Sequence, residues 1–240
     1  MSFPIVNEQR FFKTALNELV DLDSITVKEY IKGKTLMEIA ASIIKDIEYP
    51  LRLGQPDDTH IWNAFHGKWC KTINEDFWQK ASETLTVKIG DCEDSSIAFV
   101  ACARALGLTQ LQVYEAFGYV EATTGNILGG HGWVFSKGIP DDEWRLLEST
   151  LDEEPVLYPK VANIRQPFPF NNIVYVIEEL WNDKRFEEVG SLDYRKRKKR
   201  EKETREKYDA IAEAWKTDTK PGKAMRKSTL HRIRRLLRRE

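Results

Sequence analysis

The sequence predicts an α+β protein in which helices come first and an antiparallel sheet follows, with a basic helical extension at the end. Apolar residues recur at helical spacing early in the chain, whereas strand-forming residues alternate later. Consecutive strands after a run of helices favour antiparallel pairing over alternating βαβ units. Of the 240 residues, 41% are hydrophobic and 31% are charged, which is typical of a globular protein with a charged surface.

Helices are predicted over residues 7–20, 35–48 and 92–107. The first two are amphipathic, and Pro50 follows the second as a stop signal. The third has almost no polar face, which is typical of a buried helix. Gly107 is the expected C-terminal cap of this third helix, because glycine adopts the left-handed conformation easily.

Strands are predicted over residues 110–120, 131–136, 143–149 and 172–179, where strand formers alternate or cluster. The residues at 123–126, Thr-Thr-Gly-Asn, form a turn signal between the first two strands. The predicted core is therefore a buried helix followed by an antiparallel meander.

The charge of the chain is unevenly distributed. Residues 191–240 contain 19 Lys and Arg but only 8 Asp and Glu, whereas residues 1–190 contain 18 Lys and Arg against 30 Asp and Glu. We therefore expect a folded domain over 1–190 and a basic helical tail over 191–240. The tail is open to three interpretations: a solvated helix that folds back on the acidic domain, a nucleic-acid contact, or a contact with another acidic partner.

Composition also limits the compartment. No uncharged apolar run approaches the roughly 20 residues that cross a bilayer, so we expect no transmembrane segment. The N-terminus lacks a basic start followed by an apolar stretch. Three cysteines are an odd number and too few for a disulfide scaffold. We expect a cytoplasmic protein.

The string GDCEDSS lies where a loop meets the buried helix. Asp91 is the expected N-cap, and Asp94 falls at the third helical position as a carboxylate variant of the capping box. Cys92 then occupies the first helical position, where the helix dipole favours a thiolate and backbone N–H groups can bind an oxyanion. We expect Asp94 to fix the turn and Glu93 to be solvated.

A thiolate nucleophile needs a base and a group that orients the base. His131 opens a predicted strand, and Glu148 lies near the end of the next one. Adjacent antiparallel strands can place a histidine and a carboxylate side by side. The order Cys92, His131, Glu148 therefore predicts a nucleophile, a base and an orienting carboxylate.

GDCEDSS with its apolar helix, then HGWVF, then WRLLEST, together resemble the transglutaminase-like superfamily. On this resemblance Cys92 matches the nucleophile and His131 the base, and Trp133 matches the aromatic residue that follows the base. Glu148 falls at the usual aspartate position, which is a departure that keeps the carboxylate and adds a methylene.

Residues 78–85, WQKASETL, resemble the stretch that precedes GDCED in bacterial transglutaminase-like cysteine proteinases, with Ala81 in place of the usual proline. The resemblance covers about residues 76–152. It implies that Trp78 walls the site or helps to bind the oxyanion through its indole N–H, although tryptophans at such positions are more often core residues.

The resemblance implies a papain-like core in which a helix bearing the cysteine packs on an antiparallel sheet bearing the histidine and the carboxylate. It also implies thiol attack on an amide of a peptide or protein through an acyl-enzyme intermediate, without a cofactor. Water as acceptor gives hydrolysis, which we expect here because no amine-acceptor site is recognisable in the sequence, and an amine gives acyl transfer.

Two alternatives to this interpretation stay open. The same core can be a catalytically inactive adaptor that uses the basic tail for docking, or the tail can direct the protein to nucleic acid. A zinc site at His60, His66 and Cys70 lacks a fourth ligand, so we expect no metal site.

Overall fold

The structure, a computed structural model, describes residues 5–6, 17–50, 60–63, 68–72, 78–138, 141–150 and 159–189. The basic tail and most of the first predicted helix lie outside these ranges, so the domain boundary near residue 190 stays a prediction. Residues 17–20 are helical, as expected. No helix in the described part of the chain has the length and apolar character that a membrane crossing needs.

The helical layer precedes most of the sheet in sequence. It contains α2 (Ile25–Ile31), α3 (Leu36–Asp46), α4 (Ala81–Val87) and α5 (Cys92–Ala105). Helix α3 confirms the prediction over 35–48 and begins with a capping box, in which Thr35 N donates to Glu38 Oε2 at 2.7 Å. Helices α2 and α4 were not predicted, because each has seven residues and two turns give too little periodicity to recognise.

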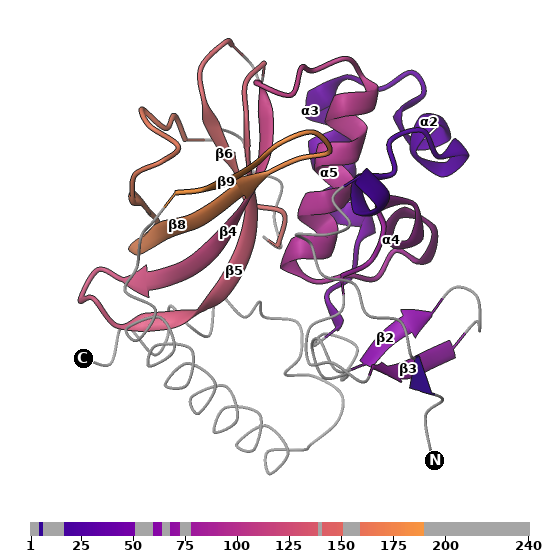
Figure 1. The fold of residues 1–240 in the computed structure, drawn as a ribbon, viewed down its shortest axis with the longest axis horizontal. Helices are drawn as coiled ribbons and strands as arrows, with labels where there is room; N and C mark the ends of the chain where they lie inside the picture. Colours follow the sequence, from indigo (N-terminus) through magenta and orange to yellow (C-terminus); the bar gives the residue numbers. More distant parts are fainter. Residues whose placement is uncertain are drawn as a thin grey trace.

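Helix α5 lies between the other helices and the sheet (Figure 1). Every residue from Cys92 to Ala103 is buried, which confirms the prediction of a helix that is covered all round. Gly107 follows it with φ +103°, as expected for a C-terminal cap. Near this end the Arg104 guanidinium donates to both carboxylate oxygens of Asp183, at 2.6 and 3.2 Å.

The main sheet is antiparallel throughout, with strand order β6-β5-β4-β8-β7 and with β9 also paired to β8. Its strands are β4 (Val113–Ala122), β5 (Ile127–Ser136), β6 (Arg145–Leu147), β7 (Phe168–Phe170), β8 (Ile173–Trp181) and β9 (Phe186–Glu188). The four predicted strands are confirmed as β4, β5, β6 and β8. The three-residue strands β7 and β9 were missed because they carry little pattern of their own.

A second, smaller sheet contains β1 (Ile5–Val6), β2 (His60–Asn63) and β3 (Lys68–Thr72). Strand β3 pairs parallel to β1 and antiparallel to β2. His60 and Cys70 therefore lie on paired strands, but their side chains and the whole of His66 are outside the described part. The expectation that these residues hold no metal stays a prediction.

The main sheet has an apolar cluster on each face. The cluster toward the helices contains Ile39, Ile43, Phe99, Val134 and Trp181 among others. The cluster on the opposite face contains the aromatic side chains of Trp133, Phe135 and Tyr175, together with Tyr114, Leu146 and Ile177. Because neighbouring residues of a strand point to opposite faces, β5 contributes to both clusters.

Gly118 on β4 leaves no room for a side chain against β8. The register between them shifts between Phe117 and Gly118, and a Cβ built on Gly118 would lie 2.1 Å from the Val176 carbonyl oxygen. No side chain fits at that distance. The bulge therefore requires glycine at position 118.

We predict that Gly118→Ala lowers the free energy of unfolding by about 2 kcal/mol or more, because the added methyl must displace the main chain of β8. Gly130→Ala is the matched control, since a Cβ there would meet only the Gly118 carbonyl oxygen at 3.9 Å. The control should stay within about 0.5 kcal/mol of the parent. Urea unfolding followed by circular dichroism measures both variants, and equal midpoints would contradict the steric assignment.

Candidate active site

Cys92 is the first residue of α5, as predicted, and is 9% exposed. Asp91 is the N-cap, and its carboxylate accepts a hydrogen bond from Asp94 N at 3.5 Å. Gly90 precedes this cap at a point where a Cβ would lie only 2.7 Å from Asp94 Cβ. The sulfur therefore lies at the positive end of the helix dipole, on a turn that has no room for a side chain at position 90.

The Asp94 carboxylate joins the segment before α4 to the start of α5 through hydrogen bonds. Its Oδ1 accepts from Gln79 N at 2.7 Å, and its Oδ2 accepts from Gln79 Nε2 at 2.5 Å. Gln79 Nε2 also donates to the Ile89 carbonyl at 3.0 Å. Burial raises the pKa of Asp94, and the hydrogen bonds from Gln79 oppose part of that rise. Asp94 thus has the structural role that we expected, with a partner that the sequence did not reveal.

The prediction of a solvated Glu93 was wrong. Glu93 is 4% exposed, and its Oε2 lies 3.2 Å from Cys92 Sγ, within hydrogen-bond distance of the thiol. Strand β5 passes against this turn at Gly132, where a Cβ would lie 3.1 Å from Glu93 Cα, and this close approach explains the burial. A carboxylate at this distance favours the protonated thiol, so a thiolate needs compensating positive charge.

Asp91, Glu93 and Asp94 form the group of described residues that could hold a metal ion, with ligand oxygens that all lie within 4.8 Å of one another. Carboxylate oxygens are the ligands that Ca²⁺ prefers, but this ion takes 6 to 8 of them. Two members are already engaged, because Asp91 caps the helix and both oxygens of Asp94 bind Gln79. These carboxylates are the type of ligand that Ca²⁺ prefers, but they are too few to complete its coordination. The expectation of no metal stays a prediction.

His131 and Glu148 are in direct contact, as the predicted strand order suggested. His131 Nε2 lies 2.7 Å from Glu148 Oε2, and the strands that carry or precede these residues, β5 and β6, are neighbours. The imidazole stacks on Trp133, with ring centroids 5.8 Å apart and planes inclined by 29°. Glu148 is 2% exposed, so its negative charge is stabilised by protein groups rather than by water.

Glu148 accepts further hydrogen bonds. Its Oε1 accepts from Thr150 N at 3.1 Å and from Thr150 Oγ1 at 2.7 Å. Its Oε2 accepts from the Tyr175 hydroxyl at 2.9 Å. Burial raises the pKa of Glu148, but the charge of His131 and the hydrogen bonds from His131 and Thr150 outweigh it, so this pKa lies below its ordinary value.

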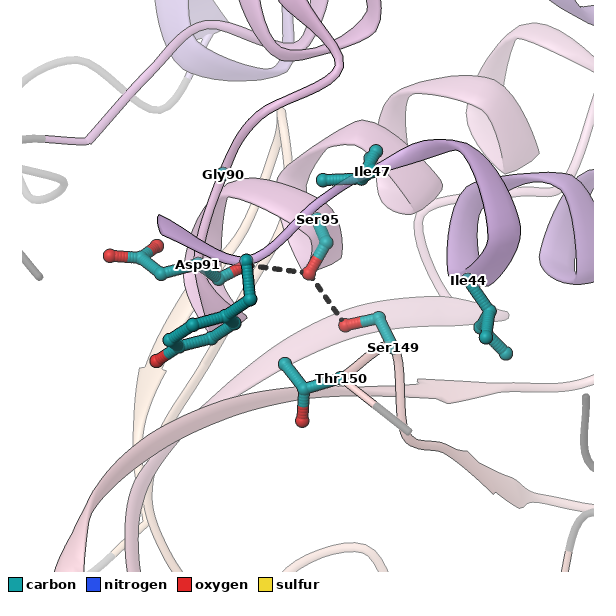
Figure 2. A pocket seen from close by; sticks show the side chains of 8 residues that line it. Ile44, Ile47, Gly90, Asp91, Ser95, Ser149 and Thr150 are labelled. Atoms are coloured by element: carbon teal, nitrogen blue, oxygen red, sulfur yellow. Dashed lines mark hydrogen bonds between the residues drawn. The ribbon is translucent and has the colours of Figure 1, made fainter. Parts of the chain in front are cut away.

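Two contacts join the segments that carry His131 and Glu148 to the first turn of α5. A Cβ on Gly132 would lie 3.1 Å from Glu93 Cα, so the strand passes against the helix backbone one residue after His131. Ser149 Oγ lies 2.8 Å from Ser95 Oγ (Figure 2). The residues directly after His131 and Glu148 therefore both contact the turn that begins at Cys92.

A small pocket of about 10 Å³, roughly the space of one water molecule, opens beside this turn (Figure 2). Its lining combines apolar side chains of the segment at the end of α3 with polar groups of the site: Ile44, Ile47, Tyr49, Gly90, Asp91, Ser95, Ser149 and Thr150. The Ser95 hydroxyl donates to the Asp91 carbonyl at 2.7 Å in its wall. The pocket therefore shares Asp91 and Thr150 with the surroundings of Cys92 and Glu148.

Trp78 and Trp133 both lie in the core. Trp78 is 2% exposed and stacks on Trp181 with ring centroids 5.6 Å apart, which agrees with the core interpretation of this residue. Trp133 is fully buried behind the imidazole of His131. A role of Trp78 at the oxyanion stays a prediction.

Sequence reasoning missed Gln79, Tyr175 and the buried position of Glu93. Gln79 stands beside a motif that we quoted, but only the fold shows that it faces Asp94. Tyr175 lies on β8, which is separated from β5 by β4. An alternating strand pattern marks Tyr175 as inward-facing, but it does not reveal which residues of other strands it reaches.

The structure has the arrangement that the resemblance implied, with the cysteine at a helix start and the histidine and carboxylate on the adjoining antiparallel sheet. No protein-family model matches the chain, and no curated protein matches it. Among solved structures it is similar to calcium-bound LapG from Legionella pneumophila, with TM-score 0.41, 16% identity, and coverage of 75% of this chain and 81% of that one.

The EGTA-treated form of LapG gives TM-score 0.41 at 15% identity, covering 78% of this chain and 88% of that one. A protein from Cytophaga hutchinsonii described as a candidate cysteine protease gives TM-score 0.34 at 18% identity, covering 57% of this chain and 39% of that one. These likenesses are distant, and any functional conclusion has to come from the residues of this chain.

We predict that Glu148→Gln lowers the stability of the protein at neutral pH and has a smaller effect at acidic pH. The pKa of Glu148 is lowered from 4.5 in the folded state, so its stabilising contribution is present above that pH and is lost as the pH falls through the lower folded value. The melting temperature of the parent should exceed that of the variant at about pH 7, and the gap should close toward about pH 3. A gap that is equal at both pH values would contradict this assignment.

Proposed function

We propose that the chain is a thiol-dependent amide hydrolase that cleaves a peptide or protein through an acyl-enzyme intermediate. One observation supports this most: His131 and Glu148 are hydrogen-bonded to each other, and the residues that follow them, Gly132 and Ser149, contact the first turn of the helix that begins at Cys92. A nucleophile, a base and an orienting carboxylate at one helix start are the parts that such a reaction needs.

In the proposed reaction, Glu148 fixes the proton of the imidazole. An ionised carboxylate only accepts hydrogen bonds, so the nitrogen that faces it, His131 Nε2, carries a hydrogen. The lone pair of the neutral ring is then on Nδ1, where it can take the proton of the Cys92 thiol. The resulting imidazolium supplies the positive charge that a thiolate next to Glu93 requires.

The Cys92 thiolate attacks the carbonyl carbon of the amide, and the oxyanion that forms is bound by backbone N–H groups at the start of α5. The C–N bond breaks as His131 gives its proton to the leaving amine, which leaves a thioester. Water then attacks the thioester while His131 takes a proton from it, and the C–S bond breaks to release a carboxylic acid and the thiol. Transfer to an amine in place of water is the alternative second step.

A catalytically inactive adaptor is the second candidate, and the contact between Glu93 and the Cys92 sulfur favours it, because that carboxylate opposes thiolate formation. In this alternative the fold serves binding, and the basic residues 191–240 dock to an acidic partner or a nucleic acid. The reactivity of the thiol separates the two candidates.

We predict that iodoacetamide alkylates Cys92 faster than free cysteine at about pH 6.5, because an imidazolium partner keeps part of the thiol ionised there. His131→Ala should remove this advantage, and Cys92→Ala should remove the labelling at that position. The alkylation rates are measured by mass spectrometry of the digested protein. A separate incubation with a peptide library tests for peptide cleavage, which Cys92→Ala should abolish.

Cys102→Ala is the matched control for this labelling. Cys102 lies on the same helix but is fully buried, and burial raises its pKa to about 12. The control should leave the labelling of Cys92 unchanged. If Cys92 reacts no faster than free cysteine and no peptide is cleaved, the hydrolase is excluded and the adaptor is favoured.

A further inference from the structure

We propose that Tyr175 is a positioning residue of this site, and that its hydroxyl holds Glu148 in the orientation in which Glu148 fixes the imidazole of His131. This inference rests on the proposed function and adds a residue to it from β8, a strand that carries none of the predicted site residues.

The hydrogen bonds to Glu148 leave its carboxylate little freedom. Thr150 donates twice to Oε1, while His131 Nε2 and the Tyr175 hydroxyl share Oε2. A carboxylate has about four lone-pair sites, and these four contacts occupy them. Tyr175 therefore contacts the same oxygen as the imidazole, whereas Thr150 contacts the other oxygen.

The glutamate side chain makes such an anchor necessary. Its carboxylate is separated from the backbone by two methylenes, so three side-chain torsions must be held to aim it. Thr150 is only two residues away along the chain and holds Oε1. Without the Tyr175 hydroxyl, the carboxylate could rotate more freely about its last side-chain torsion, and Oε2 would be held less firmly toward His131.

The strand between His131 and Tyr175 leaves space for this contact. On β4, Gly118 pairs with His131 and Ala116 pairs with Trp133, so neither position places a large side chain between β5 and β8. The Tyr175 ring lies 6.1 Å from the imidazole and 5.1 Å from the Trp133 ring, measured between centroids. Small residues on the central strand thus allow a tyrosine from β8 to reach the carboxylate beyond β5.

The charge of Glu148 explains why a hydroxyl is needed at this position. The carboxylate is 2% exposed, so water does not solvate it, and each donor that contacts it stabilises the ionised form. An ionised Glu148 accepts the Nε2 hydrogen of His131, whereas a protonated one can donate to that nitrogen and favour the other tautomer. The Tyr175 hydroxyl therefore acts on the imidazole through the carboxylate.

The test compares Tyr175→Phe with Tyr114→Phe. Tyr114 is the matched control, because it belongs to the same apolar cluster and is similarly buried but has its ring against Trp144. Each variant removes one hydroxyl and keeps the ring. Circular dichroism checks that both fold.

Two readouts separate positioning from a general loss of packing. Tyr175→Phe should lower the rate of Cys92 alkylation by iodoacetamide about tenfold at about pH 6.5, the effect of one lost hydrogen bond to a charged group. At about pH 9.5 the rates should converge, because the thiol then ionises without help. The ring ¹⁵N shifts of His131, measured by NMR, should change from one tautomer to a mixture. Tyr114→Phe should change neither readout.

Parent-like alkylation and parent-like ring shifts in Tyr175→Phe would overturn the proposal. If Cys92 is unreactive even in the parent, the hydrolase proposal fails, and the tautomer of His131 still decides the role of Tyr175. If Tyr175→Phe does not fold, the hydroxyl proton of Tyr175 is observed in the parent instead. Slow exchange of this proton with solvent supports the contact with Glu148, and rapid exchange overturns it.

Discussion

The site depends on how closely strand β5 approaches the first turn of α5. At Gly132 the strand carries no side chain, and even a Cβ would lie 3.1 Å from Glu93 Cα. This contact is made by the residue that follows His131, while the hydroxyls of Ser95 and Ser149 join the segment after Glu148 to the same turn. Because both contacts involve residues next to the candidate catalytic residues, the sheet and helix can align the candidate site without using the side chains of His131 and Glu148 as supports.

The surroundings of the helix start are unusually acidic for a buried region, and different acids are accommodated in different ways. Asp91 caps the helix, Asp94 is satisfied by Gln79, and Glu148 is ionised against His131. Glu115, on β4, forms no hydrogen bond through its carboxyl oxygens within the described residues, and burial together with the charge of Asp94 raises its pKa well above the ordinary value. Burial of Glu115 therefore disfavours its ionised form, whereas the donors around Glu148 favour the ionised form of that residue.

Local sequence patterns predicted the long helices and strands and the helix ends that have clear capping residues. The apolar helix from Cys92, its N-cap at Asp91 and its glycine stop are properties of consecutive residues, and the order of β4, β5 and β6 follows from short turns. Cys92 could be named because it begins such a helix and Glu148 because it follows such a strand, whereas His131 lies inside β5, which begins four residues earlier than the predicted strand.

The remaining features depend on which surfaces meet in three dimensions. Glu93 is one residue from the predicted nucleophile, but only the position of Gly132 explains why it is buried. Tyr175 reaches Glu148 because β8 pairs with β4 in a register that contains a bulge. Pairing between strands that are distant in sequence is not encoded in any local pattern, so these contacts could not be predicted.

The carboxylate beside the Cys92 sulfur has a consequence for what can approach it. Glu93, Asp91 and Asp94 surround the start of α5 with acidic groups whose oxygens lie within 4.8 Å of one another. A field of this sign repels anions and attracts cations at short range. For the hydrolase proposed above, we therefore expect these groups to disfavour substrates with an acidic side chain next to the scissile bond and to favour neutral or basic ones.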